Sequence, residues 1–161
     1  QYAQGVWSFV DDTVVLEATK PIGSPRFRLF TKDELNIRKP AVSGTWVAIV
    51  GLPRVGPATG MEVVFESKTG KRAAAVTNPA GDAVVTMDDS EVWTRAGLRR
   101  KGDSSELQWF DIPADRVADH IACFAVDDEK WVVPQAFDFL RLKRKNKMLV
   151  SEDGRMKYSR E

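Results

Sequence analysis

Apolar and polar residues alternate over short stretches along most of the chain, the pattern of β-strands with one buried face. The stretches 26–31 (RFRLFT) and 61–67 (MEVVFES) alternate strictly, whereas 44–51 (GTWVAIVG) is almost wholly apolar, as in a strand buried on both faces. Turn-forming residues separate most of these stretches, and the KTG turn that ends at Gly70 joins two of them as a hairpin. The pattern predicts that antiparallel sheet dominates the structure.

Helical signals are confined to two short segments. Residues 31–39 contain the Thr-x-x-Glu spacing of a capping box and stop before Pro40. Residues 112–122 place Pro113 in a first helical turn. We therefore expect an α+β, β-rich fold, built as a mainly antiparallel sheet or two packed sheets with one or two short helices.

Length and composition indicate an ordinary globular chain. It has 161 residues, of which 43% are hydrophobic and 29% are charged. No apolar run reaches the length of a transmembrane helix, so no membrane partner is expected. The single Cys123 cannot form an internal disulfide, which slightly favours a reducing, intracellular compartment. The chain starts at Gln1, so it could be an excised domain or a processed form that has lost a targeting segment. The localisation therefore stays open.

The positive charge is concentrated at the C-terminal end. Residues 141–161 contain eight Lys or Arg and three Asp or Glu, which gives +5. The net charge is +1, so residues 1–140 carry −4. We therefore predict a β-rich body over 1–140 and a basic C-terminal strand or hairpin over 141–161, turning near Asp153 and Gly154, that continues the same domain.

This basic segment is the first candidate binding surface. In a strand, residues 141, 143, 145 and 147 share one face at intervals of about 6.6 Å, close to the charge spacing of a nucleic-acid backbone. The predicted nucleic-acid-binding residues here are Arg141, Lys143, Arg144, Lys145, Lys147, Arg155 and Lys157. The alternatives are a solvated edge strand whose lysines discourage strand pairing, or a surface for an acidic protein partner.

A second basic cluster lies between two tryptophans. Bases stack on aromatic rings and phosphates pair with cations, so interleaved residues of both kinds are typical of single-strand binding. The residues concerned are Trp93, Arg95, Arg99, Arg100, Lys101 and Trp109. Both tryptophans also lie in apolar runs, so a place in the core is the alternative for each.

The stretch 63–71 (VVFESKTGK) is the most enzyme-like part of the chain. Glu66 and Lys68 stand two apart in a strand, so they project to the same side, where a carboxylate could hold a divalent ion and a lysine could orient a water. These residues resemble the E-x-K half of the PD-(D/E)xK nuclease motif, and 118–134 resembles the strand–turn–strand that follows the active site in some homing nucleases of that fold. The resemblance implies Mg²⁺- or Mn²⁺-dependent phosphodiester cleavage, although the acidic residue it requires at the end of the preceding strand is missing from 44–51. A cross-strand charge pair is the alternative.

These observations favour a non-catalytic nucleic-acid-binding module that uses its basic C-terminal face and needs no metal or other cofactor. Its expected partner is RNA or DNA, held by backbone charge, and the chain could be one domain of a larger assembly. A metal-dependent phosphodiesterase centred on Glu66 and Lys68 is one alternative. A protein-interaction or scaffold domain is the other.

Overall fold

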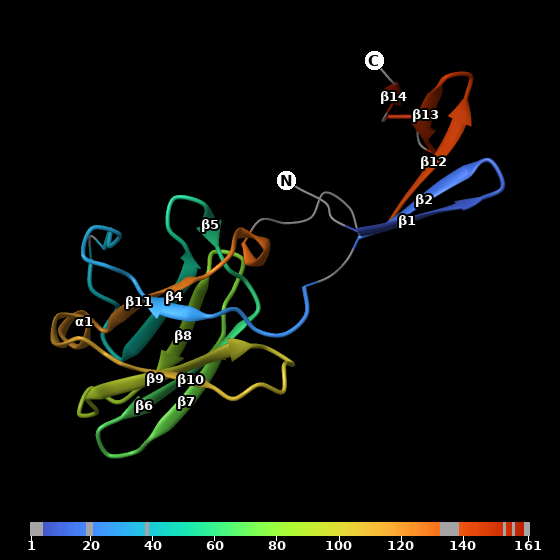
Figure 1. Cartoon of the computed structure of the whole chain (residues 1–161). Coiled ribbons are helices and arrows are strands. Elements are labelled where there is room, and N and C mark those ends of the chain that lie inside the picture. The colour runs from blue at the N-terminus through green and yellow to red at the C-terminus, as the bar shows by residue number, and fades with distance from the viewer. Residues whose placement is uncertain are drawn as a thin grey trace. The chain divides into compact units, whose positions relative to one another are not determined.

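The structure is a computed structural model, and it describes residues 5–18, 21–37, 39–132, 139–152, 154–155 and 157–159. Within them lie fourteen strands, one α-helix and one 3-10 helix (Figure 1). The expected β-rich architecture with antiparallel sheets and short helices is confirmed.

The chain divides into two compact units. Unit 1 consists of residues 1–21 and 133–161, and unit 2 consists of residues 22–132. The boundary expected from the charge pattern lies after residue 140 instead. The difference arises because the N-terminal strands pair with the basic C-terminal strands, a long-range pairing that local patterns do not reveal.

Unit 1 is built on one antiparallel sheet of five strands in the order β1-β2-β12-β13-β14. The strands are β1 (Gly5–Val10), β2 (Thr13–Ala18), β12 (Phe139–Lys145), β13 (Met148–Ser151) and β14 (Lys157–Ser159). Two-residue turns that begin at Asp11 and Asn146 close the first two hairpins, and both residues adopt a left-handed φ, 55° and 56°. Asp and Asn tolerate this conformation better than most residues. The expected hairpin near Gly154 corresponds to β13 and β14, while Asp153 lies outside the described residues.

One face of the unit 1 sheet forms a small apolar core. Directly opposed residues of neighbouring strands share a face, and Val14 is opposed by Leu142 as Leu16 is by Leu140. Val14, Leu140 and Leu142 are buried together, with Leu149 packed against them from β13. The residues that alternate with these along β12 therefore point to the opposite face.

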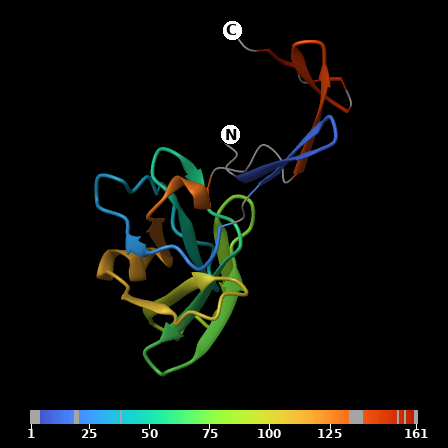
Figure 2. The same ribbon diagram turned by 45° about the vertical axis from the view of Figure 1, so that its right-hand side comes forward.

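Unit 2 contains two sheets (Figures 1 and 2). The first has the order β10-β9-β6-β7, with β6 (Met61–Ser67), β7 (Arg72–Val76), β9 (Trp93–Arg100) and β10 (Gln108–Asp111). The second consists of β3 (Phe27–Leu29), β11 (Ile121–Val126), β4 (Thr45–Leu52), β5 (Gly56–Pro57) and β8 (Asp82–Thr86). Only the pairing of β4 with β11 is parallel among the described strands, and the short helices are α1 (Ala114–Asp119) and the 3-10 turn η1 (Glu129–Trp131).

The core of unit 2 draws side chains from both sheets. Trp46 of β4 stacks on Trp93 of β9 with ring centroids 5.5 Å apart, and Phe65 of β6 packs against Trp93 at 5.0 Å. All three are at most 1% exposed. Along β6 every second residue is buried, so the alternation in the sequence directly sets the inner face. β4 also alternates, rather than being buried on both faces as expected, whereas β11 is buried along its whole length.

One of the two expected helices is present. Pro113 precedes α1 as its N-cap residue. The helix expected over 31–39 is wrong, because residues 31–34 form only a turn and the described residues from 35 to 39 contain no helix. The Glu34 carboxylate accepts the Thr31 N–H, as in a capping box, but both of its oxygens are also held by the Arg28 guanidinium of β3, at 2.6 and 2.9 Å.

Candidate nucleic-acid interface

The β12 strand of unit 1 aligns its cations as the sequence pattern predicts. Arg141, Lys143 and Lys145 alternate with the buried Leu140 and Leu142, so they share the opposite face of the sheet. Successive cations along this strand lie about 6.6 Å apart.

The returning strand adds a fourth cation to this face. Lys143 is opposed by Val150 of β13, and Val150 is opposed by Lys157 of β14, so both lysines project to the same side. With one strand between them, they lie roughly 10 Å apart. We call Arg141, Lys143, Lys145 and Lys157 the basic face.

Three other predicted residues of this segment lie elsewhere. Arg144 is opposed by Leu149 and therefore belongs to the apolar side of the sheet. Lys147 lies in the turn between β12 and β13, beyond the end of the strand, and Arg155 lies between β13 and β14. All three are exposed, so they extend positive charge around the hairpin ends without joining the basic face.

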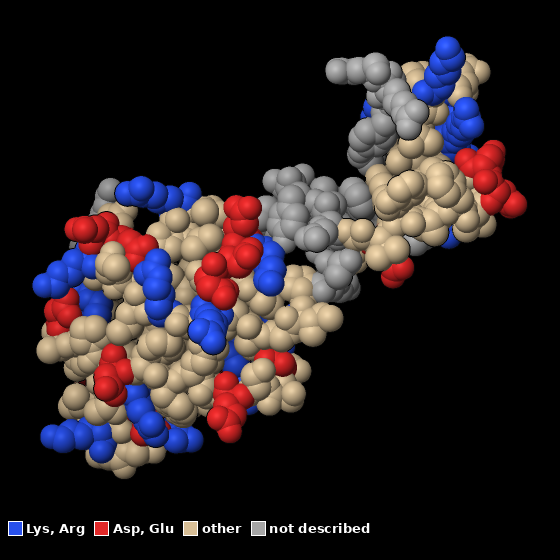
Figure 3. All heavy atoms as spheres, in the orientation of Figure 1, with Lys and Arg blue, Asp and Glu red and all other residues tan. Residues whose placement is uncertain are grey.

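The cations of the basic face are exposed, and its three lysines differ from Arg141 in their charge partners. Lys143, Lys145 and Lys157 make no ion pair with any described residue, and Arg141 has a long one to Glu152, with 4.0 Å between Nη1 and Oε1. In Figure 3, Lys and Arg side chains lie over β12 and β13, and acidic side chains lie beside them near the tip of the β1–β2 hairpin. An incoming anion could therefore pair with these lysines without displacing a carboxylate.

Trp7 and Phe9, which are exposed aromatic residues in the described part of unit 1, do not contribute to this face. Trp7 and Phe9 are opposed by Leu16 and Val14, so they belong to the apolar side of the sheet. A ligand on the basic face would therefore be held mainly by charge rather than by stacking on these rings.

The second predicted cluster, in unit 2, is arranged differently. Trp93 is 1% exposed and stacks on Trp46 in the core, so it cannot stack on a base in this fold. Its indole N–H donates to the carbonyl oxygen of Arg95 at 3.1 Å. The expectation that Trp93 belongs to a binding surface is thus corrected, and its alternative place in the core is confirmed.

The arginines of this cluster are held by carboxylates of the neighbouring strand. Arg95 donates to both oxygens of Glu66 at 2.7 and 3.1 Å, and Arg72 donates to Glu66 at 2.7 Å. Arg99 donates to Glu62 at 2.9 Å. We call these five residues the charge-paired face. Hydrogen bonds from Arg95 and then Arg72 lower the pKa of Glu66, and the bond to Glu66 raises the pKa of Arg95.

Trp109 lies flat on this same outer surface. The guanidinium carbons of Arg95 and Arg72 are 4.1 and 5.0 Å from its ring centroid. The ring covers Gly97, where an added Cβ would approach the indole to 3.1 Å. The half-buried indole therefore packs against Gly97 and the two guanidinium groups, which makes Trp109 a structural partner of the arginines.

The remaining cations of the second cluster, Arg100 and Lys101, are not part of the charge-paired face. Arg100 lies over the ring of Trp131, with 5.6 Å between Cζ and the centroid. Lys101 follows the end of β9 and is exposed. The structure therefore does not bring Arg95, Arg99, Arg100 and Lys101 together as one open cationic surface.

The E-x-K pair occupies a β-bulge rather than a regular strand end. The pairing of β6 with β9 shifts register between Glu66 and Ser67, and Lys68 follows the strand with an exposed side chain. Both oxygens of Glu66 are engaged by arginines, which disfavours a metal ion there. Among the described residues, no group of three or more His, Cys, Asp or Glu side chains is placed to hold a metal ion.

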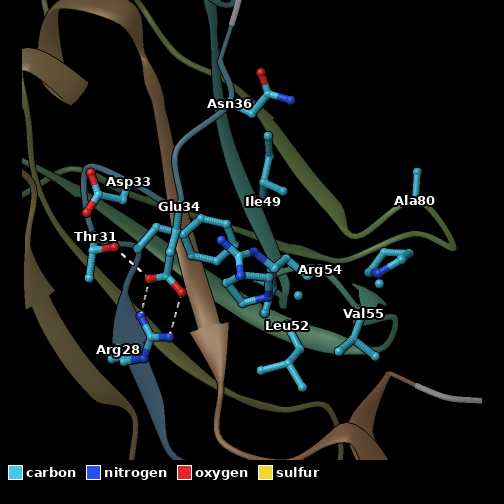
Figure 4. A pocket seen from close by; sticks show the side chains of 16 residues that line it. Arg28, Thr31, Asp33, Glu34, Asn36, Ile49, Leu52, Arg54, Val55 and Ala80 are labelled. Carbon is cyan, nitrogen blue, oxygen red and sulfur yellow. Dashed lines mark hydrogen bonds and ion pairs between the residues drawn. The ribbon is translucent and has the colours of Figure 1, made fainter.

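A hollow of about 920 Å³ lies in unit 2, between the segment after β3 and the β4–β5 loop (Figure 4). On one wall the ion pair of Arg28 and Glu34 lowers the pKa of that carboxyl to about 2, chiefly through the Arg28 hydrogen bond. On the other wall stands Arg54, which has a left-handed φ of 66°. Asp33 also lines the hollow, so the lining contains both positive and negative side chains. The hollow therefore has no clear preference for a ligand of one charge.

No protein-family model, curated protein or solved structure matches the chain. Neither of the short helices in the described part of the chain could cross a lipid bilayer.

Proposed function

We propose that the chain binds RNA or DNA without catalysis, through the phosphate backbone and the basic face of unit 1. One observation carries the proposal. Cations from two strands, β12 and β14, project to one side of a sheet, and three of them make no ion pair with any described residue. This arrangement leaves them available to phosphate groups.

The spacing of the basic face suits a charged backbone. The intervals of about 6.6 Å along β12 and about 10 Å between Lys143 and Lys157 are close to two and three times the axial charge spacing of about 3.4 Å along one strand of duplex DNA. Lysine is flexible and acts as a point charge, so it tolerates such approximate matching. This supports backbone binding with little sequence preference.

The charge-paired face of unit 2 supports a structural role instead. A phosphate that approached Arg72, Arg95 or Arg99 would compete with carboxylates already bound to them. On the visible side of unit 2, Figure 3 shows positive and negative side chains interspersed. The same pairing occupies Glu66, so the phosphodiesterase hypothesis gains no support from this geometry.

The proposal is tested by reversing charge on the basic face. Lys143→Glu/Lys145→Glu should weaken binding of a fluorescently labelled duplex or single strand by at least about tenfold at low salt, measured by anisotropy. The matched control is Lys68→Glu/Lys71→Glu, which changes two exposed lysines of unit 2 and gives the same net charge, +1 − 4 = −3. The control should bind nearly as well as the unmodified chain.

Two results would contradict the proposal. One is unchanged affinity of Lys143→Glu/Lys145→Glu, with a circular dichroism spectrum that shows it to be folded. The other is an equal loss in both variants, which would mean that net charge rather than the basic face governs binding.

A further inference from the structure

The N-terminal strand β1 (Gly5–Val10) is an exposed edge of the unit 1 sheet. Its only strand neighbour among the described residues is β2. All six of its residues are exposed, including four large apolar ones: Val6 at 72%, Trp7 at 60%, Phe9 at 67% and Val10 at 58%. Isolated surface hydrophobics are common, but four large exposed apolar residues within one six-residue edge strand are not.

This edge lacks the features that usually prevent strand pairing. β1 contains no charged residue, no proline and no bulge in its register with β2. The opposite edge of the same sheet, β14, begins with Lys157. The outward N–H and C=O groups of β1 are therefore accessible to another strand.

The sequence of β1 is nearly symmetric about its centre. Residues 6–10 read Val-Trp-Ser-Phe-Val, with Ser8 in the middle. If two copies of this strand pair antiparallel about Ser8, each Val6 is opposed by Val10 and each Trp7 by Phe9 of the other copy. This register keeps the apolar side of both sheets continuous, because directly opposed residues share a face.

The same register is favourable in charge and in ring geometry. Asp11 is opposed by Gly5 of the other copy, so no like charges meet. Within one copy the Trp7 and Phe9 rings already lie edge to face at 5.4 Å, the arrangement that aromatic pairs prefer. Cross-strand contacts between Trp7 and Phe9 would extend this arrangement across the two-fold axis.

We propose that β1 pairs with β1 of a second copy of this chain, in an antiparallel register centred on Ser8. The contact is isologous, so it closes as a two-fold dimer instead of growing into a fibre. The four apolar side chains of each copy offer at most about 1,000 Å² for the pair, below the size of standard stable interfaces. The dimer should accordingly be weak and concentration-dependent. The proposal is independent of nucleic-acid binding.

A cysteine at the centre tests the register directly. Opposed Cα atoms in antiparallel strands are about 4.5–5.5 Å apart, within the range that a disulfide needs. Ser8→Cys should therefore form a disulfide-linked dimer when oxidised with copper phenanthroline. Cys123 should not interfere, because it is buried and its pKa is raised to about 11.

Single and mixed cysteine variants distinguish this register from others. Val10→Cys alone should form little linked dimer, because its two copies would lie about 14 Å apart along the pair of strands. A mixture of Val6→Cys and Val10→Cys should form a linked heterodimer. Val6→Lys/Val10→Lys, which places like charges opposite each other, should sediment as a monomer at concentrations where the unmodified chain is partly dimeric.

Three outcomes would overturn the proposal. In the first, Ser8→Cys cross-links no more than Val10→Cys does. In the second, the unmodified chain sediments as a monomer at every concentration up to about 1 mM. In the third, Trp7→Ala/Phe9→Ala loses nucleic-acid affinity while the unmodified chain is monomeric. The last result would assign the exposed rings to base stacking.

Discussion

The two basic clusters of this molecule look alike in the sequence and differ in the structure. On the charge-paired face of unit 2, Arg95 and Arg72 flank Glu66, which lies between them on β6. On the basic face of unit 1, Lys143 has Thr13 and Val150 as its cross-strand neighbours. The difference depends on which residues the register places opposite each cation.

This comparison shows that a count of cations does not identify a binding surface. The arginines of unit 2 use their planar donors in bonds to carboxylates and stack on Trp109, so they stabilise the sheet. The lysines of unit 1 have no such carboxylate among the described residues. Their charge is therefore available to a partner, unlike that of the carboxylate-bound arginines of unit 2.

The largest effect should come from the tryptophan inside the second cluster. Trp93→Ala should lower the free energy of unfolding by roughly 3–5 kcal/mol, because it empties a buried site beside Trp46 and Phe65. Urea unfolding measures this loss, with Trp109→Ala as a less destabilising comparison at a half-buried position. A stable Trp93→Ala variant with reduced nucleic-acid affinity would contradict the assignment of Trp93 to the core.

The thiol of Cys123 tests how well unit 2 is closed. Burial raises its pKa to about 11, so at pH 8 the thiolate fraction should be about 10²-fold smaller than that of an ordinary cysteine. Reaction with iodoacetamide should be slowed by at least that factor in the native protein and should accelerate when urea unfolds it. A native thiol that reacts as fast as free cysteine would show that the core is open.

Single alanine substitutions should separate the two clusters by their salt dependence. Lys143→Ala and Lys157→Ala should each reduce the slope of log K against log salt by about 0.9 for duplex DNA, because each removes one phosphate contact. Arg95→Ala and Arg99→Ala should leave the slope unchanged and lower the thermal midpoint by a few degrees. The reverse pattern would place the interface on unit 2.

Acid should affect the arginine-bound carboxylates of unit 2 more than the basic face of unit 1. The pKa of Glu66 is lowered by Arg95 and Arg72, and that of Glu34 is lowered to about 2 by Arg28. A carboxylate whose pKa is lowered in the native state stabilises the fold at pH values above its ordinary pKa of 4.5. This contribution is lost as the pH falls from there towards the native pKa. The thermal midpoint should therefore fall between about pH 5 and pH 2.

Glutamine substitutions provide the control for this acid effect. Glu66→Gln and Glu34→Gln should lower the thermal midpoint at neutral pH and make its decline in acid shallower, because the titrating group is gone. An unchanged decline in both variants would show that other carboxylates dominate the acid response.

Local sequence patterns predicted much of this architecture. The alternation of 61–67 identified β6 and its inner face, and Pro113 marked the start of the helix that forms. The alternation of cations that begins at Arg141 predicted that Arg141, Lys143 and Lys145 share one side of a strand, as they do on β12. Each of these inferences depended on residues close together in the chain.

Features that depend on distant partners could not be predicted in the same way. The capping-box spacing at residues 31–34 indicated a helix, but Arg28 holds Glu34 in a turn. Pairing of β2 with β12 joins segments more than a hundred residues apart, so local patterns do not reveal it. The carboxylates of Glu62 and Glu66 were visible in the sequence, yet only the register shows which arginines they meet.

The most direct test of the account is the affinity of the unmodified chain for labelled duplex DNA and for single-stranded DNA and RNA, measured by anisotropy over a series of salt concentrations. Four phosphate contacts on the basic face predict a slope of log K against log salt of about −3 to −4 for the duplex, so affinity should fall about 10²-fold between 50 and 200 mM salt. No binding to any of these nucleic acids at 50 mM salt, or binding that does not change with salt, would contradict the central claim that the basic face engages a phosphate backbone.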